Sequence, residues 1–260
     1  MQAVCNNFNT MATKQKPKAK QKKEDRSAWV PQRDKIAFQL NIRDFPFTDK
    51  QKAFITLALD KDTKVILLDG PAGSSKTLLG VYVALQMLQL KKNGEIVYVR
   101  SLVESADKGM GFLPGEASDK FGPFAQPLME KLDELLPVGD IRKLTAEERI
   151  KPIPVNFMRG LSLYATTCIV DECQNLTAKE LITILTRIGK FSKFFFMGDH
   201  QQSDLHPEKR GGFASIIQAF DNEDSRAQGI YVLKFDKEDI MRSDILRFII
   251  GQLETAGLAK

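Results

Sequence analysis

The sequence lacks several features that would restrict its fold or its location. Only three cysteines, Cys5, Cys168 and Cys173, occur among 260 residues, and their spacing does not fit a metal site. So few cysteines exclude a disulfide-rich scaffold and predict free thiols in a reducing compartment. No apolar run is long enough to span a bilayer, and the N-terminus lacks the apolar core of a signal peptide. We therefore expect a cytoplasmic protein without membrane attachment.

Most of the chain also lacks an excess of charge of either sign. Residues 14–26 carry seven Lys or Arg side chains against two acidic ones, which accounts for the whole net charge of +5. Residues 1–34 contain few apolar side chains, so burial cannot offset the entropy cost of ordering them, and we predict a disordered, lysine-rich tail. The tail could bind nucleic acid phosphates or serve only for solubility. Residues 35–260 are predicted to form one domain.

Short apolar runs alternate with helical patterns from residue 65 onward. Five runs are typical of buried strands: residues 65–68, 96–99, 168–170, 194–197 and 230–233. This alternation predicts an α/β fold, in which an open parallel sheet carries helices on both faces and binds ligands beyond the carboxyl ends of its strands. The Gly- and Pro-rich stretch 101–164 is expected to be a set of inserted loops near the site, with one helix at residues 128–136.

A phosphate-binding loop is predicted between the first strand and the helix that begins near Lys76. The segment fits the pattern G-x-x-x-x-G-K-[ST] except at its second glycine, where Ser75 stands. Its residues are Gly70, Pro71, Ala72, Gly73, Ser74, Ser75, Lys76 and Thr77. Backbone N–H groups and the helix dipole favour a phosphate chain there, Lys76 suits the β- and γ-phosphates, and Thr77 suits a magnesium ion. The segment therefore indicates a nucleoside triphosphate site.

Two adjacent acids follow the strand at residues 168–170. The end of this strand should lie beside the phosphate loop, so we assign Asp171 to the magnesium ion and Glu172 to the orientation and deprotonation of an attacking water. A second acid suited to activating water favours hydrolysis over phosphoryl transfer. Gln202, after the next strand, could sense the γ-phosphate. His200 and His206 have no partner pattern for a metal site or a catalytic triad, so we interpret both as loop residues.

Seven segments in order resemble the PhoH-like proteins, a family of phosphate-starvation-inducible ATPases of bacteria and their phages. They are GPAGSSKT at 70–77, GFLPGE at 111–116, FMRG at 157–160, IVDECQN at 169–175, LTRIG at 185–189, MGDHQQSDL at 197–205 and DIMRS at 239–243. The family is similar to the first motor domain of superfamily one helicases. The resemblance therefore implies a single RecA-like P-loop NTPase domain that uses ATP and Mg²⁺.

The resemblance also implies roles for individual residues. Gln51 would recognise adenine, although Thr48 and Gln51 also fit a helix capping box, which would explain the glutamine without a ligand. Arg242 would be an arginine finger, and Gln174 and Gln202 match glutamines of family segments. Arg100 and Arg159 match positions that would face the site or a nucleic acid strand. Two residues depart from the usual pattern, since Ser75 replaces a glycine and Cys173 an alanine, and Ser75 is expected to reshape the loop or weaken nucleotide affinity.

These features together predict a magnesium-dependent ATPase coupled to RNA or single-stranded DNA. One sheet cannot form the cleft between two motor domains, so Arg242 would act on a neighbouring subunit, and we expect a homo-oligomer, which the family resemblance suggests is a hexameric ring. Two alternatives stay open. One is an ATP-driven ribonuclease or helicase, and the other is a nucleotide-gated nucleic-acid-binding protein with slow turnover.

Overall fold

The computed structural model describes residues 36–101 and 122–240, together with residues 245, 248, 249, 252 and 255. The predicted tail at 1–34, the segment at 111–116 and Arg242 lie outside the described residues. No helix of the described part has the length and apolar composition that crossing a membrane requires.

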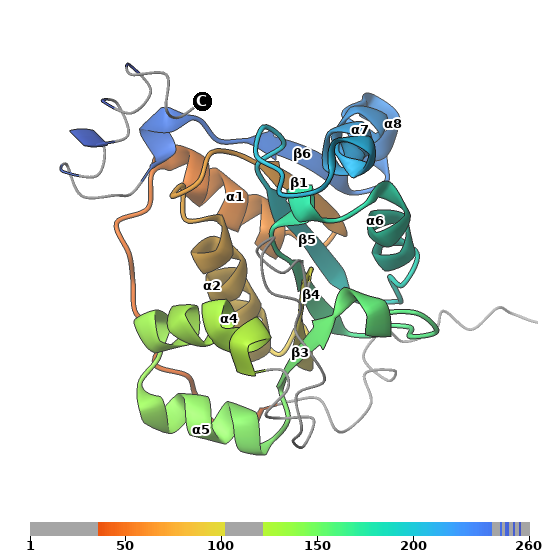
Figure 1. Cartoon of the computed structure of the whole chain (residues 1–260). Helices are drawn as coiled ribbons and strands as arrows, with labels where there is room; N and C mark the ends of the chain where they lie inside the picture. Colours follow the sequence, from red (N-terminus) through yellow and green to blue (C-terminus); the bar gives the residue numbers. More distant parts are fainter. Residues whose placement is uncertain are drawn as a thin grey trace, which may run out of the picture. The chain divides into compact units, whose positions relative to one another are not determined.

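A six-stranded sheet forms the centre of the described chain (Figure 1). Its strands, in the order β3-β2-β4-β5-β1-β6, are Ile150–Pro154, Glu95–Arg100, Thr166–Val170, Lys193–Gly198, Val65–Asp69 and Ile230–Lys234. Every neighbouring pair is parallel. The predicted open parallel sheet is therefore confirmed, but the count of five strands is wrong. β3 escaped prediction because it contains Pro152 and Pro154, which an edge strand tolerates since its outer N–H groups need no partner.

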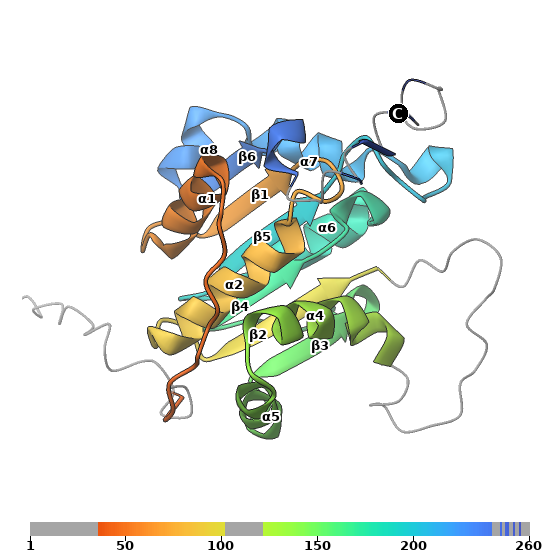
Figure 2. The ribbon, with the colours of Figure 1, turned by 90° about the vertical axis from the view of Figure 1, so that its left-hand side faces the viewer.

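Helices cover both faces of the sheet (Figures 1 and 2). The core of one face includes residues of α1 (Asp49–Leu59), α2 (Lys76–Gln89), α4 (Gly122–Leu135) and α5 (Val138–Ala146). The core of the other includes residues of α6 (Ala178–Leu185) and α7 (Gly212–Phe220). The short helix α8 (Glu223–Ala227) precedes β6, and four 3₁₀ turns complete the described elements: η1 (Val155–Phe157), η2 (Cys173–Asn175), η3 (Pro207–Lys209) and η4 (Lys237–Asp239).

Alternation along the central strands separates the two cores. In β5, Phe195 and Met197 pack against α1 and α2, whereas Phe194 and Phe196 belong to the core that α6 and α7 cover. All four side chains are fully buried. Successive strand residues point to opposite faces, so a strand covered on both faces consists of a continuous apolar run rather than an alternating pattern. This is why the sequence showed these strands clearly.

The stretch between β2 and β4 is more regular than expected. It contains α4, α5 and β3 among its described residues, whereas the sequence predicted inserted loops with a single helix. Leu128 and Leu132 of α4 are fully buried in the same core as α2. Some of the Gly and Pro residues that suggested loops lie in the 102–121 segment, outside the described residues, and the others include residues of α4, the N-cap of α5 and the edge strand. The insertion therefore extends one layer of the domain.

Asp140 of α5 fastens the segment before α1 to this layer. Its carboxylate, 4% exposed, accepts the backbone N–H of Asn41 at 2.9 Å and the Asn41 side chain at 3.3 Å. These bonds, first the backbone one, and the nearby Lys143 ammonium lower the pKa of Asp140 below its usual 3.8. A lowered pKa in the folded state means that the ionised carboxylate stabilises the fold.

We expect Asp140→Ala to lower the free energy of unfolding by about 1.5–3 kcal/mol at pH 7, the range for hydrogen bonds to a charged group. The difference from the parent should be complete above pH about 4 and should shrink as the pH falls further, because the carboxylate is then protonated in both states. Urea unfolding at several pH values measures it. The exposed Asp133 of α4 provides the control Asp133→Ala, and an equal, pH-independent loss in both variants would contradict the interpretation.

Candidate functional site

Side chains of the loop between β1 and α2 form hydrogen bonds to carbonyl oxygens of the same loop. Lys76 Nζ donates to the carbonyl oxygens of Gly70 at 2.7 Å and Pro71 at 2.9 Å, and the Ser74 hydroxyl donates to Pro71 at 2.8 Å. Burial lowers the pKa of Lys76, and the negative charges of nearby carboxylates oppose this shift. Those carboxylates belong to Asp199, Glu172, Asp171 and Asp69. The predicted loop lysine is thus surrounded by acids from the ends of three strands, β1, β4 and β5.

Ser75 occupies the left-handed region of backbone space, at φ 59° and ψ 25°. It directly precedes α2, and its side chain makes no capping hydrogen bond to the helix. A non-glycine residue in this conformation costs roughly 1–2 kcal/mol. Ser75 thus has the left-handed conformation at the position where the pattern has glycine, and its expected effect on nucleotide affinity stays a prediction. The first N–H groups of α2 have no side-chain cap, which suits them to an anion.

Thr77 and Asp171, the predicted metal ligands, meet directly. The Thr77 hydroxyl donates toward both carboxylate oxygens of Asp171, at 3.0 and 3.1 Å. The Tyr98 hydroxyl, from the neighbouring strand β2, donates to the same carboxylate at 2.7 Å. Burial and then the charge of Asp171 raise the pKa of Tyr98, so this tyrosine stays a protonated donor. Tyr98 was missed by the sequence analysis, although a lone hydroxyl in an aliphatic strand signals a buried partner.

The oxygen atoms gathered at this point fit a magnesium ion. Mg²⁺ prefers hard oxygen ligands and takes few of them from the protein, usually one or two carboxylates, with water and phosphate oxygens for the rest. Asp171, 4% exposed, and the Thr77 hydroxyl offer that set at the first turn of α2. They could hold the ion beside a phosphate chain. Cys173, which is buried close to them, is a soft ligand of little use to Mg²⁺.

Glu172 follows Asp171 with a left-handed backbone, at φ 52° and ψ 46°. Burial raises its pKa, and the negative charge of Asp171 adds to this shift. The Gln174 side chain donates to Glu172 Oε2 at 2.5 Å, and the positive charge of Arg100 also acts on Glu172; both lower its pKa. A carboxylate held in a partly dry site with a raised pKa is suited to accept a proton. Arg100, which ends β2, therefore lies near Glu172, and the role that the resemblance implies for it stays a prediction.

The end of β5 brings a second group of titratable side chains to the loop. His200 donates its backbone N–H to Asp69 Oδ1 at 3.0 Å, and its ring Nδ1 lies 2.6 Å from Asp69 Oδ2. One ligand atom each of Asp69, Asp199 and His200 lie within 4.8 Å of one another. His200 is thus a turn residue, as expected, but it has a partner, Asp69, that the sequence analysis missed. His200 lies two residues beyond the end of β5, and Asp69 ends the neighbouring strand β1. Knowledge of the strand order could therefore have indicated this pair.

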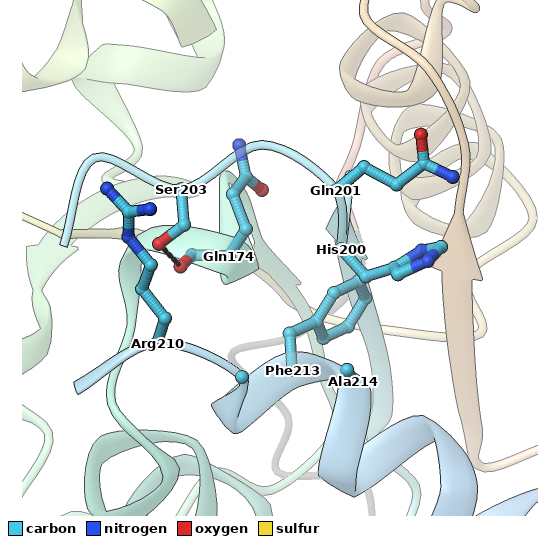
Figure 3. A pocket seen from close by; sticks show the side chains of 8 residues that line it. Gln174, His200, Gln201, Ser203, Arg210, Phe213 and Ala214 are labelled. Carbon is cyan, nitrogen blue, oxygen red and sulfur yellow. Dashed lines mark hydrogen bonds between the residues drawn. The ribbon is translucent and has the colours of Figure 1, made fainter. Parts of the chain in front are cut away.

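Figure 3 shows a pocket beside this turn, lined by His200, Gln201, Ser203, Arg210 and Gln174 among others. Ser203 donates from its hydroxyl to the Gln174 carbonyl oxygen at 2.9 Å. The Gln174 side-chain oxygen accepts the Asp199 N–H at 3.1 Å. Gln174 therefore joins the turn after β5 to Glu172.

The remaining predicted site residues lie in different surroundings. Gln51 is fully buried and forms the predicted capping box with Thr48. Gln202 is exposed in the turn after β5, and its backbone N–H donates to Asp199. Arg159 is exposed after η1. Arg242 lies outside the described residues, so its role stays a prediction, as do the contacts of Gln51 and Gln202 with a nucleotide.

Comparison with known proteins agrees with these motifs. Residues 45–254 match the PhoH-like protein family. A PhoH-like protein of Mycobacterium bovis is 33% identical over 205 residues, which cover 79% of this chain and 56% of that protein. A PhoH-like protein of Bacillus subtilis is 33% identical over 181 residues, 70% of this chain and 55% of that one. The chain thus spans about half the length of these relatives.

A solved structure supports the fold. The large terminase from a thermophilic bacteriophage superposes with a TM-score of 0.51 over 80% of this chain and 50% of the terminase chain. The two sequences are 12% identical, so the likeness concerns the fold alone. It agrees with the P-loop NTPase type of α/β fold.

We expect Ser75→Gly to raise the free energy of unfolding by about 1 kcal/mol, because glycine adopts the left-handed conformation without strain. Denaturant unfolding of the two proteins measures the change. Ser215→Gly is a matched control, since the exposed Ser215 lies within α7, where the same substitution should destabilise by roughly 0.5–1 kcal/mol. Destabilisation by both substitutions would show that the backbone at Ser75 carries no strain.

Proposed function

The chain belongs to the family of PhoH-like proteins, and on that premise we propose that it binds ATP with Mg²⁺ at the loop 70–77 and hydrolyses it. One observation carries the proposal: the Thr77 hydroxyl contacts both oxygens of Asp171, a residue 94 positions later in the chain. A threonine after the loop lysine and an acid at the end of β4 are the two protein ligands that a P-loop enzyme uses for its magnesium ion.

Each residue of the site has a role in this proposal. The backbone N–H groups of residues 72–77 and the Lys76 ammonium bind the phosphate chain, while Thr77 and Asp171 would hold the metal ion, with Tyr98 fixing the carboxylate. The ion, when bound, neutralises charge on the phosphate oxygens. Glu172 orients a water for attack on the terminal phosphorus and accepts its proton. Gln202 and Arg242 would contact the γ-phosphate, Arg242 from a neighbouring subunit.

The coupling partner and the assembly follow from the family premise. We propose that ATP turnover is coupled to RNA or single-stranded DNA, and that the protein works in the cytoplasm as a homo-oligomer, with a hexameric ring as the expected form. The strained Ser75 favours one alternative, a nucleotide-gated binding protein with slow turnover. An ATP-driven ribonuclease or helicase is the other. ATPase rates with and without a panel of RNA and DNA strands, together with strand-separation assays, distinguish the three.

Two substitutions separate binding from turnover. Lys76→Ala should weaken ATP binding at least about 100-fold, because the phosphates lose a buried charge-assisted partner. Glu172→Gln should keep ATP affinity and lower kcat by about 10²–10⁴-fold, the usual contribution of a general base. Calorimetric binding and a phosphate-release assay measure these effects.

Exposed residues provide the matched controls Lys179→Ala and Glu223→Gln, which should leave both quantities unchanged. Normal turnover by Glu172→Gln would show that Glu172 is not the general base. Normal ATP binding by Lys76→Ala would show that the loop 70–77 does not bind the nucleotide.

A mixing experiment tests the action of Arg242 across subunits. Arg242→Ala and Glu172→Gln subunits should each be inactive alone. Mixed together, they should recover part of the activity, because an intact Glu172 site can then receive the intact Arg242 of a neighbour. Sedimentation with ATP bound reports the assembly. A monomer that hydrolyses ATP at the full rate would contradict the oligomer.

A further inference from the structure

Gln51 is a buried, hydrogen-bonded polar side chain beside the phosphate loop. It lies in the first turn of α1 and is 0% exposed. Its Oε1 accepts the backbone N–H of Thr48 at 3.0 Å. Its Nε2 donates to the carbonyl oxygens of Asp239 at 3.2 Å and Ser74 at 3.4 Å. The side chain therefore bridges three segments: the start of α1, the phosphate loop and η4.

The hydrogen-bonding capacity of this amide leaves little for a ligand. A glutamine side chain has two N–H donors and a carbonyl oxygen with two lone pairs. Gln51 Nε2 donates to two main-chain carbonyl oxygens, one lone pair of Oε1 accepts an N–H, and the side chain is 0% exposed. A group that reads a nucleobase needs a free donor or acceptor at the surface of its pocket, and withdrawing a buried amide from its partners would leave those partners unsatisfied.

The residues around Gln51 make the bridge stiff. Asp239, 3% exposed, accepts the Thr48 hydroxyl at 2.9 Å and the Asp236 backbone N–H at 3.0 Å. Lys50 Nζ lies 3.5 Å from the Asp239 carboxylate and also contacts Asp236. The carbonyl oxygen of Asp239 thus belongs to a turn that is tied to both ends of the α1 capping box. The position of this oxygen is therefore fixed, and Gln51 connects it to the phosphate loop.

The contact with Ser74 lies directly before the strained residue of the loop. Ser75 has its left-handed backbone at φ 59°, and such a conformation persists only where surrounding contacts hold it. Gln51 holds the carbonyl that begins the Ser74–Ser75 peptide unit, while the Ser74 hydroxyl is held by Pro71. We propose that Gln51 is a positioning residue that fixes the phosphate loop from the η4 turn, and that it does not read the base of the nucleotide.

This inference rests on the proposed function, because it concerns the same nucleotide site. It is tested with Gln51→Met, which keeps the length of the side chain and removes its hydrogen bonds. Binding of ATP, GTP and inorganic tripolyphosphate, each with Mg²⁺, is measured by calorimetry. Tripolyphosphate has no base, so a loss of its binding can only come from the loop. We expect all three ligands to bind about tenfold more weakly, a change of about 1.4 kcal/mol, with the ratio of ATP to GTP affinity unchanged.

A loss confined to ATP, with GTP and tripolyphosphate unaffected, would overturn the inference and return Gln51 to adenine recognition. The control is Gln218→Met on the exposed face of α7, which should change none of the three affinities. A further variant, Gln51→Met combined with Ser75→Gly, should lose less than Gln51→Met alone, because glycine needs no support in the left-handed region. Equal losses in both backgrounds would contradict the role assigned to Ser75.

Hydrogen exchange of the ligand-free protein separates this inference from the proposed function. In the Gln51→Met variant, the backbone amide hydrogens of residues 74–77 should exchange at least several-fold faster than in the parent protein, without any nucleotide present. If the parent binds no triphosphate at all but this acceleration is seen, the proposed function fails and the positioning role stands. If exchange at the loop is unchanged, the positioning role fails whatever the protein binds.

Discussion

The register of three parallel strands is the constraint on which the site depends. β5 lies between β4 and β1, with Val170 paired to Phe196 and Asp69 paired to Gly198. The strands therefore end nearly level, and the polar residues that follow them meet at one edge. This register places Thr77 within reach of Asp171, and phenylalanines buried on both faces of β5 help to hold the strands in place. The chemistry of the site is thus set by apolar packing beneath it.

Two of the six non-glycine residues with positive φ in the described part of the chain, Ser75 and Glu172, lie in segments that follow the carboxyl ends of these strands. Ser75 and Glu172 both have left-handed backbones without being glycine, and both belong to segments that would contact the phosphates or the water. Each is held by neighbours: Gln51 bonds the carbonyl that precedes Ser75, and Gln174 bonds the Glu172 side chain. Each of these conformations costs of order 1–3 kcal/mol. The packing of the buried sheet around them offsets this cost. Rigid contacts around a site keep its groups aligned for a ligand.

The parts of the fold that follow from local patterns were predictable. Central strands are apolar throughout and α2 follows a recognisable loop, so the sheet and the Thr77–Asp171 pair could be expected. β3 could not, because its prolines are compatible only with an edge position, which is a property of the finished sheet. The contacts of Tyr98 and His200 depend in the same way on which strands become neighbours, and the sequence pattern alone did not establish that order.

Lys76 stabilises the loop through hydrogen bonds that a phosphate chain must replace when it binds. Its ammonium donates to two carbonyl oxygens of its own loop, although four carboxylates surround it and burial lowers its pKa. A phosphate oxygen is a charged acceptor and forms the stronger bond, but each carbonyl that is released must be solvated again. The affinity for phosphate is therefore a difference between two sets of hydrogen bonds, and it depends on the residues that shape the loop as well as on those that touch the ligand.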